Sequence, residues 1–359
     1  MSKVSVIIPA YNQGCYLGEA IDSVVKQTYP DFEVIVVDDG STDHTPEVVA
    51  SYSDERIRYI YQDNRGLSAA RNTGIRHSTG IYLSFLDSDD LFLPEKLALL
   101  VEELKNKPEI GLVAGQAIPI DEHGNRIGAI FARPFPEDTA QLLLRNPVHV
   151  GSVMLRRHWQ EKVGFFDETL RSYEDWDMWL RLGKEGCKMG WVDKPVSLYR
   201  FHPAQMTRIG SQMTTANFAV LDKIFSDPKI PESWQELHDE AYCYAYLRAA
   251  ANAYHSRDCT NAEAFLGKAV ALKPELLANN AQALAHQFYV WAALPKESNP
   301  LAFLEYIYNH LPERLSELRQ RRRQDLSRAA IEMAFESYRR GDLAQARYEI
   351  RRAFIHCPS

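Results

Sequence analysis

The N-terminal part of the chain alternates short apolar runs with segments that are apolar on one face only. Residues 4–8 and 32–37 are apolar runs of strand length, and such runs are typical of strands covered on both faces. Between them the apolar positions follow the spacing of a one-sided helix, at Leu17, Ala20, Ile21, Val24 and Val25. Tyr29-Pro30 then ends the helix. The order predicts a strand, helix, strand unit with parallel strands.

The alternation continues for a further two strands. The pattern predicts helices near 45–50, 66–77 and 94–105, and strands at 57–61 and 81–86. Each strand ends in polar or acidic residues, at the edge where open parallel sheets bind their ligands. After residues 110–120 the pattern loosens into hairpin-like signals, including 121–125, which predicts a mixed sheet. The expected fold class is therefore an α/β, Rossmann-like mixed sheet.

From about residue 206 strand signals stop and helices dominate, so we expect an α/β domain at 1–205 and an all-α domain at 206–359. One internal repeat has a displacement of 84 residues: Tyr254, Asp258, Ala262, Ala269 and Pro274 recur as Tyr338, Asp342, Ala346, Ala353 and Pro358. The two stretches resemble part of a tetratricopeptide repeat, whose tandem copies normally recur every 34 residues. An ordinary helical bundle and a repeat scaffold for a protein partner both remain open.

Composition and charge narrow the functional classes. With 359 residues, 45% hydrophobic and 25% charged, the chain has enough apolar residues for two cores. Its net charge of −7 argues against a whole-protein nucleic-acid binder. Residues 314–359 carry 11 arginines against 6 acids, a local +5, which leaves −12 for the rest. That basic segment is either a solvated helical face or a surface for an anionic membrane or acidic partner.

The expected location is cytoplasmic. Five cysteines, at Cys15, Cys187, Cys243, Cys259 and Cys357, are scattered singly, which favours a reducing compartment. The first predicted strand starts almost at Met1 and leaves no room for a signal peptide. No apolar run is long enough to span a bilayer, so membrane contact would be peripheral, at the inner face.

The sharpest chemical signal is Asp87-Ser88-Asp89-Asp90, directly after a predicted strand. Three carboxylates in four residues repel one another unless a cation neutralises them. Oxygen ligands, completed by substrate phosphates, suit Mg²⁺ or Mn²⁺ better than zinc. Taken alone, the same residues would also serve as a helix N-cap.

Five stretches taken together closely resemble the family 2 inverting glycosyltransferases of GT-A fold, over roughly residues 3–205. They are Val4-Ser5-Val6-Ile7-Ile8-Pro9-Ala10-Tyr11-Asn12, Asp38-Asp39-Gly40-Ser41, Gly66-Leu67-Ser68-Ala69-Ala70-Arg71-Asn72, Asp87-Ser88-Asp89 and Glu174-Asp175-Trp176-Asp177. The resemblance implies metal-dependent transfer of a sugar from a nucleotide-diphospho-sugar to a hydroxyl acceptor. It implies nothing about residues 210–359.

The resemblance also implies roles for the donor-binding residues. Pro9, Ala10 and Tyr11 would frame the nucleotide base, with the Tyr11 ring available for stacking. Asp39 would accept a hydrogen bond from the base or ribose, although it would equally serve as a helix cap. Arg65 or Arg71 would lie near the base or diphosphate, or form a packing salt bridge instead.

The resemblance assigns binding of the metal and the diphosphate to the acidic stretch Asp87-Ser88-Asp89. Asp87 and Asp89 would hold the metal, with Asp89 the more direct ligand, and Asp87 and Ser88 would contact the donor. His202 is a third candidate ligand, or a hydrogen-bonded structural histidine. The metal would stabilise the charge that gathers on the departing nucleoside diphosphate.

Inverting transfer needs a base opposite the leaving group, and the acidic cluster at 174–177 supplies the candidates. By resemblance Asp175 is the base and Glu174 positions the acceptor or the base. On a helix, Trp176, Trp179 and Leu180 would form a buried stripe, and the helix N-terminus would favour the carboxylate form of Asp175. Enrichment of acids in a first helical turn is the structural alternative.

Other nucleotide-binding classes lack their sequence signals. Pro9-Ala10-Tyr11-Asn12-Gln13-Gly14 is neither GxGxxG nor GxxxxGK[ST], nor the Gly-rich, Arg-containing loop of a nucleotidyltransferase. A scaffold protein that binds sugar nucleotides without turnover is the non-enzyme alternative. The resemblance implies a UDP-sugar as donor. We expect a growing glycan or lipid-linked sugar as acceptor, and the acceptor site would be lined by the loop before Glu174 and by residues 138–155, including His149, Gly151 and Ser152.

Overall fold

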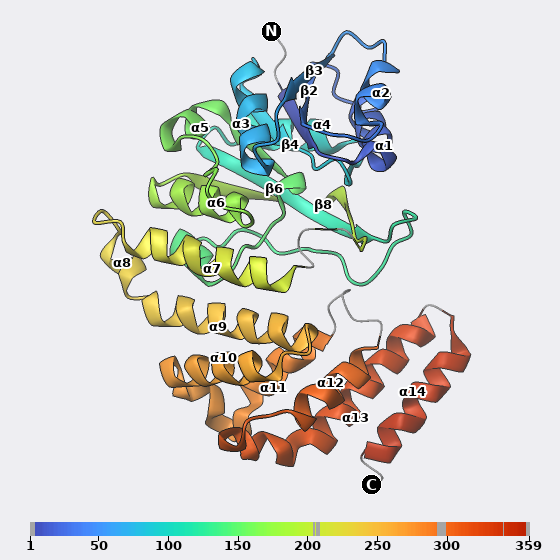
Figure 1. The fold of residues 1–359 in the computed structure, drawn as a ribbon, viewed down its shortest axis with the longest axis vertical. Coiled ribbons are helices and arrows are strands. Elements are labelled where there is room, and N and C mark those ends of the chain that lie inside the picture. The colour runs from blue at the N-terminus through green and yellow to red at the C-terminus, as the bar shows by residue number, and fades with distance from the viewer. Residues whose placement is uncertain (1–3, 204, 206–208, 293–298, 340, 357–359) are drawn as a thin grey trace. The chain divides into compact units, whose positions relative to one another are not determined.

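The computed structural model describes residues 4–203, 205, 209–292, 299–339 and 341–356 (Figure 1). The chain divides into two compact units, Met1–Ala241 and Tyr242–Ser359. The first unit extends past the predicted boundary at residue 205 and includes α7 (Gly210–Phe225) and α8 (Glu232–Gln235). One physical reason is that Lys223 of α7 lies 2.6 Å from the carboxylate of Asp167.

An eight-stranded mixed sheet forms the centre of the first unit, as predicted. Its order is β3 (Ile57–Gln62), β2 (Phe32–Asp39), β1 (Val4–Ala10), β4 (Tyr82–Phe85), β7 (Val153–Arg156), β6 (Ile110–Ile120), β8 (Lys188–Arg200) and β5 (Leu91–Phe92). The first four strands are parallel, β7 is antiparallel to both of its neighbours, and β6 and β8 run parallel. The predicted turn at 121–125 follows β6, with Asp121 and Asn125 hydrogen-bonded across it.

Helices cover the sheet and bury the stripes that the sequence predicts. They are α1 (Gly14–Val25), α2 (Thr45–Ala50), α3 (Leu67–His77), α4 (Lys96–Asn106), α5 (Arg157–Val163) and α6 (Glu174–Lys184). In α1 the apolar stripe from Leu17 to Val24 is fully buried, while Val25 is only partly buried. Helix α4 begins at Lys96, so Pro94 precedes the helix instead of opening it.

Two short 3-10 turns, η1 (Thr139–Leu144) and η2 (Val150–Ser152), cross the segment between β6 and β7. Both begin at a side chain that caps the turn, Asp138 for η1 and His149 for η2. Residues Val148 and Val150 are buried, so this segment is anchored to the unit without a regular helix or strand.

The second unit is helical throughout its described residues. It contains most of α9 (His238–His255), then α10 (Cys259–Leu272), α11 (Ala278–Ala292), α12 (Pro300–Asn309), α13 (Ser316–Arg339) and α14 (Leu343–His356). A core of alanine, leucine and aromatic side chains lies between these helices. No helix in the described part of the chain is long and apolar enough to cross a membrane.

The 84-residue repeat corresponds to two helical hairpins, α9–α10 and α13–α14. Asp258 and Asp342 play the same role, since each accepts a hydrogen bond from a backbone N–H in the first turn of the following helix. The tyrosines differ, because Tyr254 is fully buried and Tyr338 is 66% exposed. Pro358 lies outside the described residues.

Candidate functional site

The β1–α1 loop and the β2–α2 loop meet at the carboxyl edge of the sheet. Pro9 and Ala10 are buried as the last residues of β1, and Tyr11, the next residue, is 49% exposed. Asn12 follows with a positive φ of 52°, and its backbone N–H donates to Ser41 Oγ at 3.0 Å. The loop therefore presents the Tyr11 ring to solvent from a fixed backbone.

Asp38 and Asp39, at the end of β2, are buried and bound to protein groups. Asp38 accepts from the Tyr59 hydroxyl at 2.7 Å and from the backbone N–H of Ser41 at 2.8 Å. Asp39 accepts from the backbone N–H groups of Arg65 and Gly66, at 2.9 and 2.7 Å. In this structure Asp39 thus fixes the loop at the start of α3, a segment distant from it in sequence.

The acidic turn after β4 sends its three carboxylates to three different partners. Asp87 pairs with Arg71, and Asp89 Oδ2 lies 2.9 Å from His202 Nε2. Asp90 is fully buried and accepts the backbone N–H of Arg200 at 2.7 Å. Ser88, between them, is buried. The repulsion expected in this turn is relieved by separate cationic and hydrogen-bonding partners.

Arg71 connects two parts of the predicted site. It lies on α3, is 1% exposed, and its two terminal nitrogens contact Asp87 and Glu174. Burial opposes the charged form of Arg71, but the two carboxylates outweigh it and raise the pKa of the guanidinium. Because one side chain reaches both acids, the end of β4 and the start of α6 lie next to each other.

Arg65 does not share this position. Its guanidinium donates to Glu168 at 2.8 Å and is half exposed, while its backbone N–H binds Asp39. Of the two arginines that the sequence offered, Arg71 lies among the acids of the site and Arg65 contributes a surface ion pair. In both cases the observed contacts are protein salt bridges.

Asp175 lies in the first turn of α6, whose buried stripe includes Trp176, Trp179 and Leu180 as predicted. Asn146 donates to Asp175 Oδ2 at 3.0 Å, and Oδ1 accepts the backbone N–H of Trp176 at 2.7 Å. Burial, and then the charge of Glu174, raises the pKa of Asp175 to about 7. The expected effect of the helix N-terminus, a stabilised carboxylate, is therefore outweighed.

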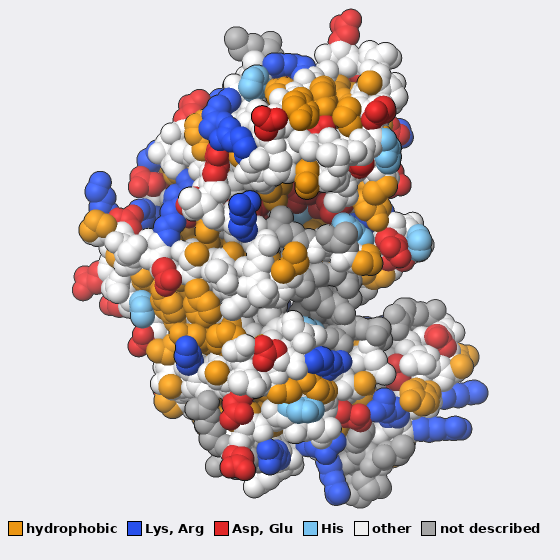
Figure 2. Space-filling model, viewed as in Figure 1, with side chains coloured by type: hydrophobic (Ala, Val, Ile, Leu, Met, Phe, Trp, Pro, Cys, Tyr) orange, Lys and Arg blue, Asp and Glu red, His pale blue; other side chains and the backbone are white. Residues whose placement is uncertain are grey.

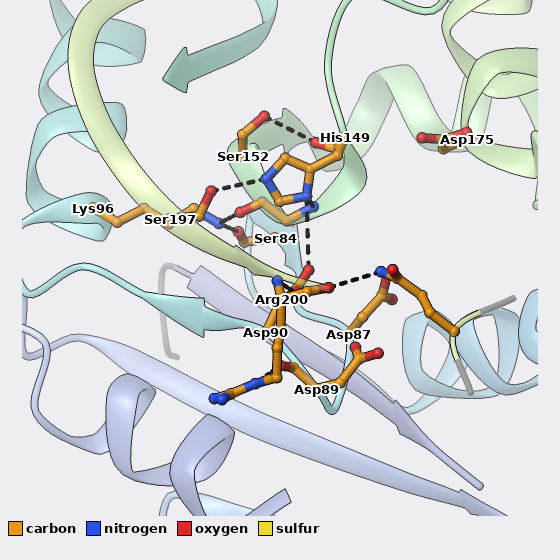
Figure 3. Close-up of polar contacts among 12 residues, drawn as sticks. Ser84, Asp87, Asp89, Asp90, Lys96, His149, Ser152, Asp175, Ser197 and Arg200 are labelled. Atoms are coloured by element: carbon orange, nitrogen blue, oxygen red, sulfur yellow. Dashed lines mark hydrogen bonds and ion pairs between the residues drawn. The ribbon is translucent and has the colours of Figure 1, made fainter. Parts of the chain in front are cut away.

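A buried polar cluster lies directly behind the acidic turn and was not anticipated as a unit (Figure 3). Lys96 is fully buried and donates to Ser84 Oγ at 3.1 Å and to the carbonyl of Gly151 at 2.7 Å. His149 Nε2 lies 2.9 Å from Ser197 Oγ, and the Gly151 N–H donates to Nδ1 at 3.2 Å. The cluster links β4, η2 and β8 beneath the turn.

Titration in this cluster favours neutral groups. Burial lowers the pKa of Lys96 well below its usual range, and burial together with Lys96 lowers the pKa of His149 to about 3. Burial and the neighbouring carboxylates Asp89 and Asp87 raise the pKa of Asp90 well above its usual range. Asp90 Oδ2 has no hydrogen-bond partner among the described groups.

Arg200, two residues before the predicted His202, and Asn146, which the sequence did not indicate, hold the site from outside the five motifs. The buried Arg200 donates to the carbonyl of Asp89 at 2.7 Å and pairs with Glu19 at 2.7 Å. The only sequence signal for a buried basic residue of this kind is a lysine or arginine among apolar neighbours. Lys96 in its helix is another example. Nothing in the local sequence of Asn146 indicates its contact with Asp175.

Among the described residues, no group of three or more His, Cys, Asp or Glu side chains is placed to hold a metal. Asp89 and His202 form a close carboxylate and imidazole pair beside the acidic turn, and both side chains are largely buried. A divalent ion at this pair would depend on ligands that the protein does not supply. Phosphate oxygens are the usual ones for Mg²⁺ and Mn²⁺.

The N-terminal part of the chain is similar in sequence to known proteins. Residues 5–163 match the model of glycosyl transferase family 2. An uncharacterized glycosyltransferase of Rickettsia felis is 36% identical over 207 residues, which cover 55% of this chain and 33% of that protein. A chondroitin synthase of Escherichia coli is 33% identical over 185 residues, 51% of this chain and 27% of that one. The chain thus spans about a third of the length of these relatives.

Solved structures extend the likeness over both units. S. aureus TarS 1-349 in complex with UDP-GlcNAc has a TM-score of 0.54 at 19% identity, covering 97% of this chain and 90% of that one. The mannosyltransferase PcManGT from Pyrobaculum calidifontis, in complex with GDP-Man and Mn²⁺, has a TM-score of 0.56 at 21% identity, covering 89% and 86%. At these identities the likeness establishes the fold. Residues 5–163 of the first unit therefore match glycosyltransferase family 2, and the chain shares the GT-A fold of these solved structures.

Proposed function

We propose that the chain is a metal-dependent, inverting glycosyltransferase that moves a sugar from a nucleotide-diphospho-sugar to an acceptor hydroxyl. The observation that carries the proposal is the Asp87, Arg71, Glu174 bridge. It joins the acidic turn, which would face the donor's diphosphate, to the helix that bears Asp175. The proposed donor site and the proposed base are then close together, because the side chain of Arg71 contacts both Asp87 and the residue next to Asp175. A one-step displacement at the anomeric carbon requires this proximity.

The donor would lie along the carboxyl edge of the sheet. Tyr11 offers its exposed ring to the base, with the buried Pro9 and Ala10 setting its position. Asp39 and the exposed part of the Arg65 side chain flank this position, and Ser88 and Asp87 follow toward the diphosphate. A UDP-sugar is our proposed donor. The TarS complex holds UDP-GlcNAc and the PcManGT complex holds GDP-Man, which supports a nucleotide-linked sugar in this fold.

The residues present fit a divalent ion on the diphosphate. Asp89 and His202 supply an oxygen and a nitrogen that already converge to 2.9 Å. Arg71 contacts Oδ1 of Asp87, whose side chain is partly exposed, so Oδ2 can still face the ion or the donor. Mg²⁺ or Mn²⁺ at this place would stabilise the charge on the leaving nucleoside diphosphate. The Mn²⁺ in the PcManGT complex supports this assignment.

Asp175 would act as the general base. The acceptor oxygen attacks the anomeric carbon, the bond from that carbon to the phosphate oxygen breaks, and the acceptor's proton passes to a carboxylate oxygen of Asp175. Asn146 holds that carboxylate from one side and the helix backbone from the other. Glu174, fixed by Arg71, would position the base. Attack from the face opposite the leaving group inverts the anomeric configuration.

The acceptor would enter on the side of the segment that carries Asn146 and His149. We propose a hydroxyl of a growing glycan or of a lipid-linked sugar. The cytoplasmic location expected from the sequence belongs to the same proposal, as does a protein partner for the helical second unit. The alternative is a scaffold that binds the sugar nucleotide and does not turn it over.

Release of nucleoside diphosphate from a set of nucleotide sugars, measured with Mn²⁺ and without it, tests the proposal. Asp175→Asn should lower the rate by about 10²-fold or more, the range for a lost general base, while donor binding in calorimetry persists. Asp193→Asn, at an exposed carboxylate of β8, is the matched control and should leave the rate unchanged. Metal-independent release, or equal rates in both variants, would overturn the mechanism. Binding without any turnover would establish the scaffold.

A further inference from the structure

The α13–α14 hairpin carries large apolar side chains on its surface. Besides Tyr348, they are Ile331, Phe335 and Tyr338 on α13, and Leu343, Ile350 and Phe354 on α14. Phe335 and Phe354 are 61% and 64% exposed, although each follows a buried alanine, Ala334 or Ala353. Isolated exposed apolar side chains are ordinary, but six on two adjacent helices indicate a contact surface.

These six side chains lie on one side of the hairpin, which we call the basic apolar face. The helices pack through Ala330, Ala334 and Ser337 against Ala346, Glu349 and Ala353, with Ser337 Oγ donating to Glu349 Oε2 at 2.9 Å. The exposed residues of α13 each follow a packing residue by one position, as do Ile350 and Phe354, and one position turns a helix by about 100°. In an antiparallel hairpin that turn brings both stripes to the same side.

Exposed arginines share this face. Helical spacing places Arg347 inside the stripe of α14 and Arg351 at its edge, with Arg328 and Arg339 at the edge of α13. Glu332 lies beside this edge of α13 and pairs with Arg328 at 3.0 Å, so the unpaired positive charge of the face comes mainly from Arg347 and Arg351 of α14. Figure 2 shows blue Lys and Arg side chains beside orange hydrophobic ones over α14.

The internal repeat shows what an equivalent face does elsewhere in this chain. Displaced by 84 residues, Ile331, Tyr338 and Ile350 correspond to Leu247, Tyr254 and Leu266, all of them buried. Helices α11 and α12 cover that face, since Tyr254 packs its ring near Trp291 and Tyr306 and donates to the carbonyl of His310 at 3.2 Å. The first hairpin thus uses this face for helix packing.

The second hairpin has lost the features that allow a helix to pack closely. Where the first has Ala251, Gly267 and Val270, the second has Phe335, Arg351 and Phe354, so small residues are replaced by protruding ones. Glu263 is likewise replaced by Arg347, which adds a positive charge to the middle of the face. A second copy would bring like charges together, because the same face would meet itself.

We propose that the basic apolar face docks on an anionic phospholipid surface. Protruding aromatic and aliphatic side chains enter the boundary between headgroups and acyl chains, and long arginine side chains beside them reach the lipid phosphates. Neither the apolar insertion nor the arginine–phosphate contact requires the precisely oriented hydrogen bonds found at the polar rim of a specific protein interface. The face would hold the chain at a membrane, where a lipid-linked acceptor would be presented, but the docking does not depend on turnover.

Flotation of the full chain with vesicles tests this proposal, using phosphatidylcholine alone and a 7:3 mixture of phosphatidylcholine and phosphatidylglycerol. Binding should require the anionic lipid. Arg347→Gln with Arg351→Gln should weaken partitioning about 25-fold, from roughly fivefold for each arginine near an anionic surface. Phe335→Ser with Phe354→Ser should weaken it by about tenfold or more, because two apolar anchors are lost. Circular dichroism melting checks that both variants stay folded.

Two matched controls separate this face from general effects. Tyr348→Ser removes an exposed aromatic side chain from a different side of α14, and Lys188→Gln with Lys229→Gln removes two exposed charges from the first unit. Both should bind the mixed vesicles as the unchanged chain does. Binding equal on both lipids, or lost equally in the controls, overturns the proposal. The proposal also fails if the unchanged chain binds no vesicles and sediments as an oligomer that dissociates when Phe335 and Phe354 are replaced by serine. That result would assign the face to a second copy of the chain.

Discussion

At the scale of single residues, the site depends on how buried charges are compensated. Arg71 is the clearest case, since one buried guanidinium faces two carboxylates, Asp87 and Glu174. Arg65 and Arg71 are equivalent candidates in the sequence. In the structure they differ in burial, because the Arg71 side chain is 1% exposed and that of Arg65 is 54% exposed. A charge that is taken out of water depends on its partners far more than an exposed one does.

That difference predicts unequal stability effects for the two arginines. Arg71→Met should lower the free energy of unfolding of the first unit by about 3 to 5 kcal/mol, because two acids lose their common cation in a largely dry site. Arg65→Met breaks an exposed pair with Glu168 and should cost about 1 kcal/mol or less. Urea unfolding followed by tryptophan fluorescence measures both. Equal losses would mean that the bridge is not the determining contact.

The pKa of Asp175 predicts the pH dependence of the proposed reaction. A base must be ionised to accept a proton, and the pKa of Asp175 is raised to about 7. The rate constant kcat/KM should therefore rise about tenfold per pH unit below pH 7 and level off above it. Glu174→Gln should move this limb to lower pH, because the charge of Glu174 is the second cause of the shift. A limb that stays in place in this variant would assign the titration to another group.

At the scale of elements, close packing of α3 on the sheet places Arg71 beside the acidic turn. Gly74 of α3 faces Ile7 of β1, and an added Cβ there would overlap the Ile7 side chain. Ile7 is fully buried in the centre of the sheet and cannot move aside. Glycine is needed at this position for space, not for an unusual backbone conformation.

Two glycine substitutions should consequently have opposite signs. Gly74→Ala should destabilise the first unit by about 1 to 3 kcal/mol through overpacking against Ile7. Gly18→Ala, inside α1, should stabilise it by about 0.5 to 1 kcal/mol, because a Cβ there meets Val48 at an ordinary 3.7 Å and alanine favours the helix. Thermal or urea unfolding compares the two. Stabilisation by Gly74→Ala would contradict the close approach of α3 and β1.

At the scale of the whole molecule, the chain combines a family 2 domain with a helical unit, each with its own core. Only the first unit contains the residues proposed to bind donor and metal. Ligand binding should therefore stabilise the first unit selectively, since a ligand stabilises the folded part that binds it.

A thermal shift measurement tests that selectivity. At about 100 times its dissociation constant, the matching nucleotide sugar with Mn²⁺ should add about 2.7 kcal/mol to the first unit and raise its Tm by about 5 to 10 °C. EDTA or Asp89→Asn should remove most of the shift, because the ion would join Asp89 to the diphosphate. Phe335→Ser with Phe354→Ser should retain it in full. A shift that survives EDTA would show donor binding without the ion.

The order of elements, the mixed sheet and the acidic strand ends could all be predicted from local sequence pattern. Apolar periodicity is local, so the stripes of α1 and α6 could be identified from spacing alone. The motifs and their order could be identified in the same way, because Asp87, Asp89 and Asp175 each lie within a short run of consecutive residues that is recognisable without the fold. Packing contributes little to either signal.

Tertiary structure alone decided which partner each polar group meets. In the buried cluster, Lys96 and Asp90 contact Gly151 and His149, which are more than fifty positions away in the sequence. No local pattern encodes such a contact. The same holds for Asn146 beside Asp175, and for the difference between the buried Tyr254 and the exposed Tyr338 in matching sequence contexts. A residue's partners, burial and pKa depend on which distant segments fold against it, whereas its preference for helix or strand depends mainly on its neighbours in the chain.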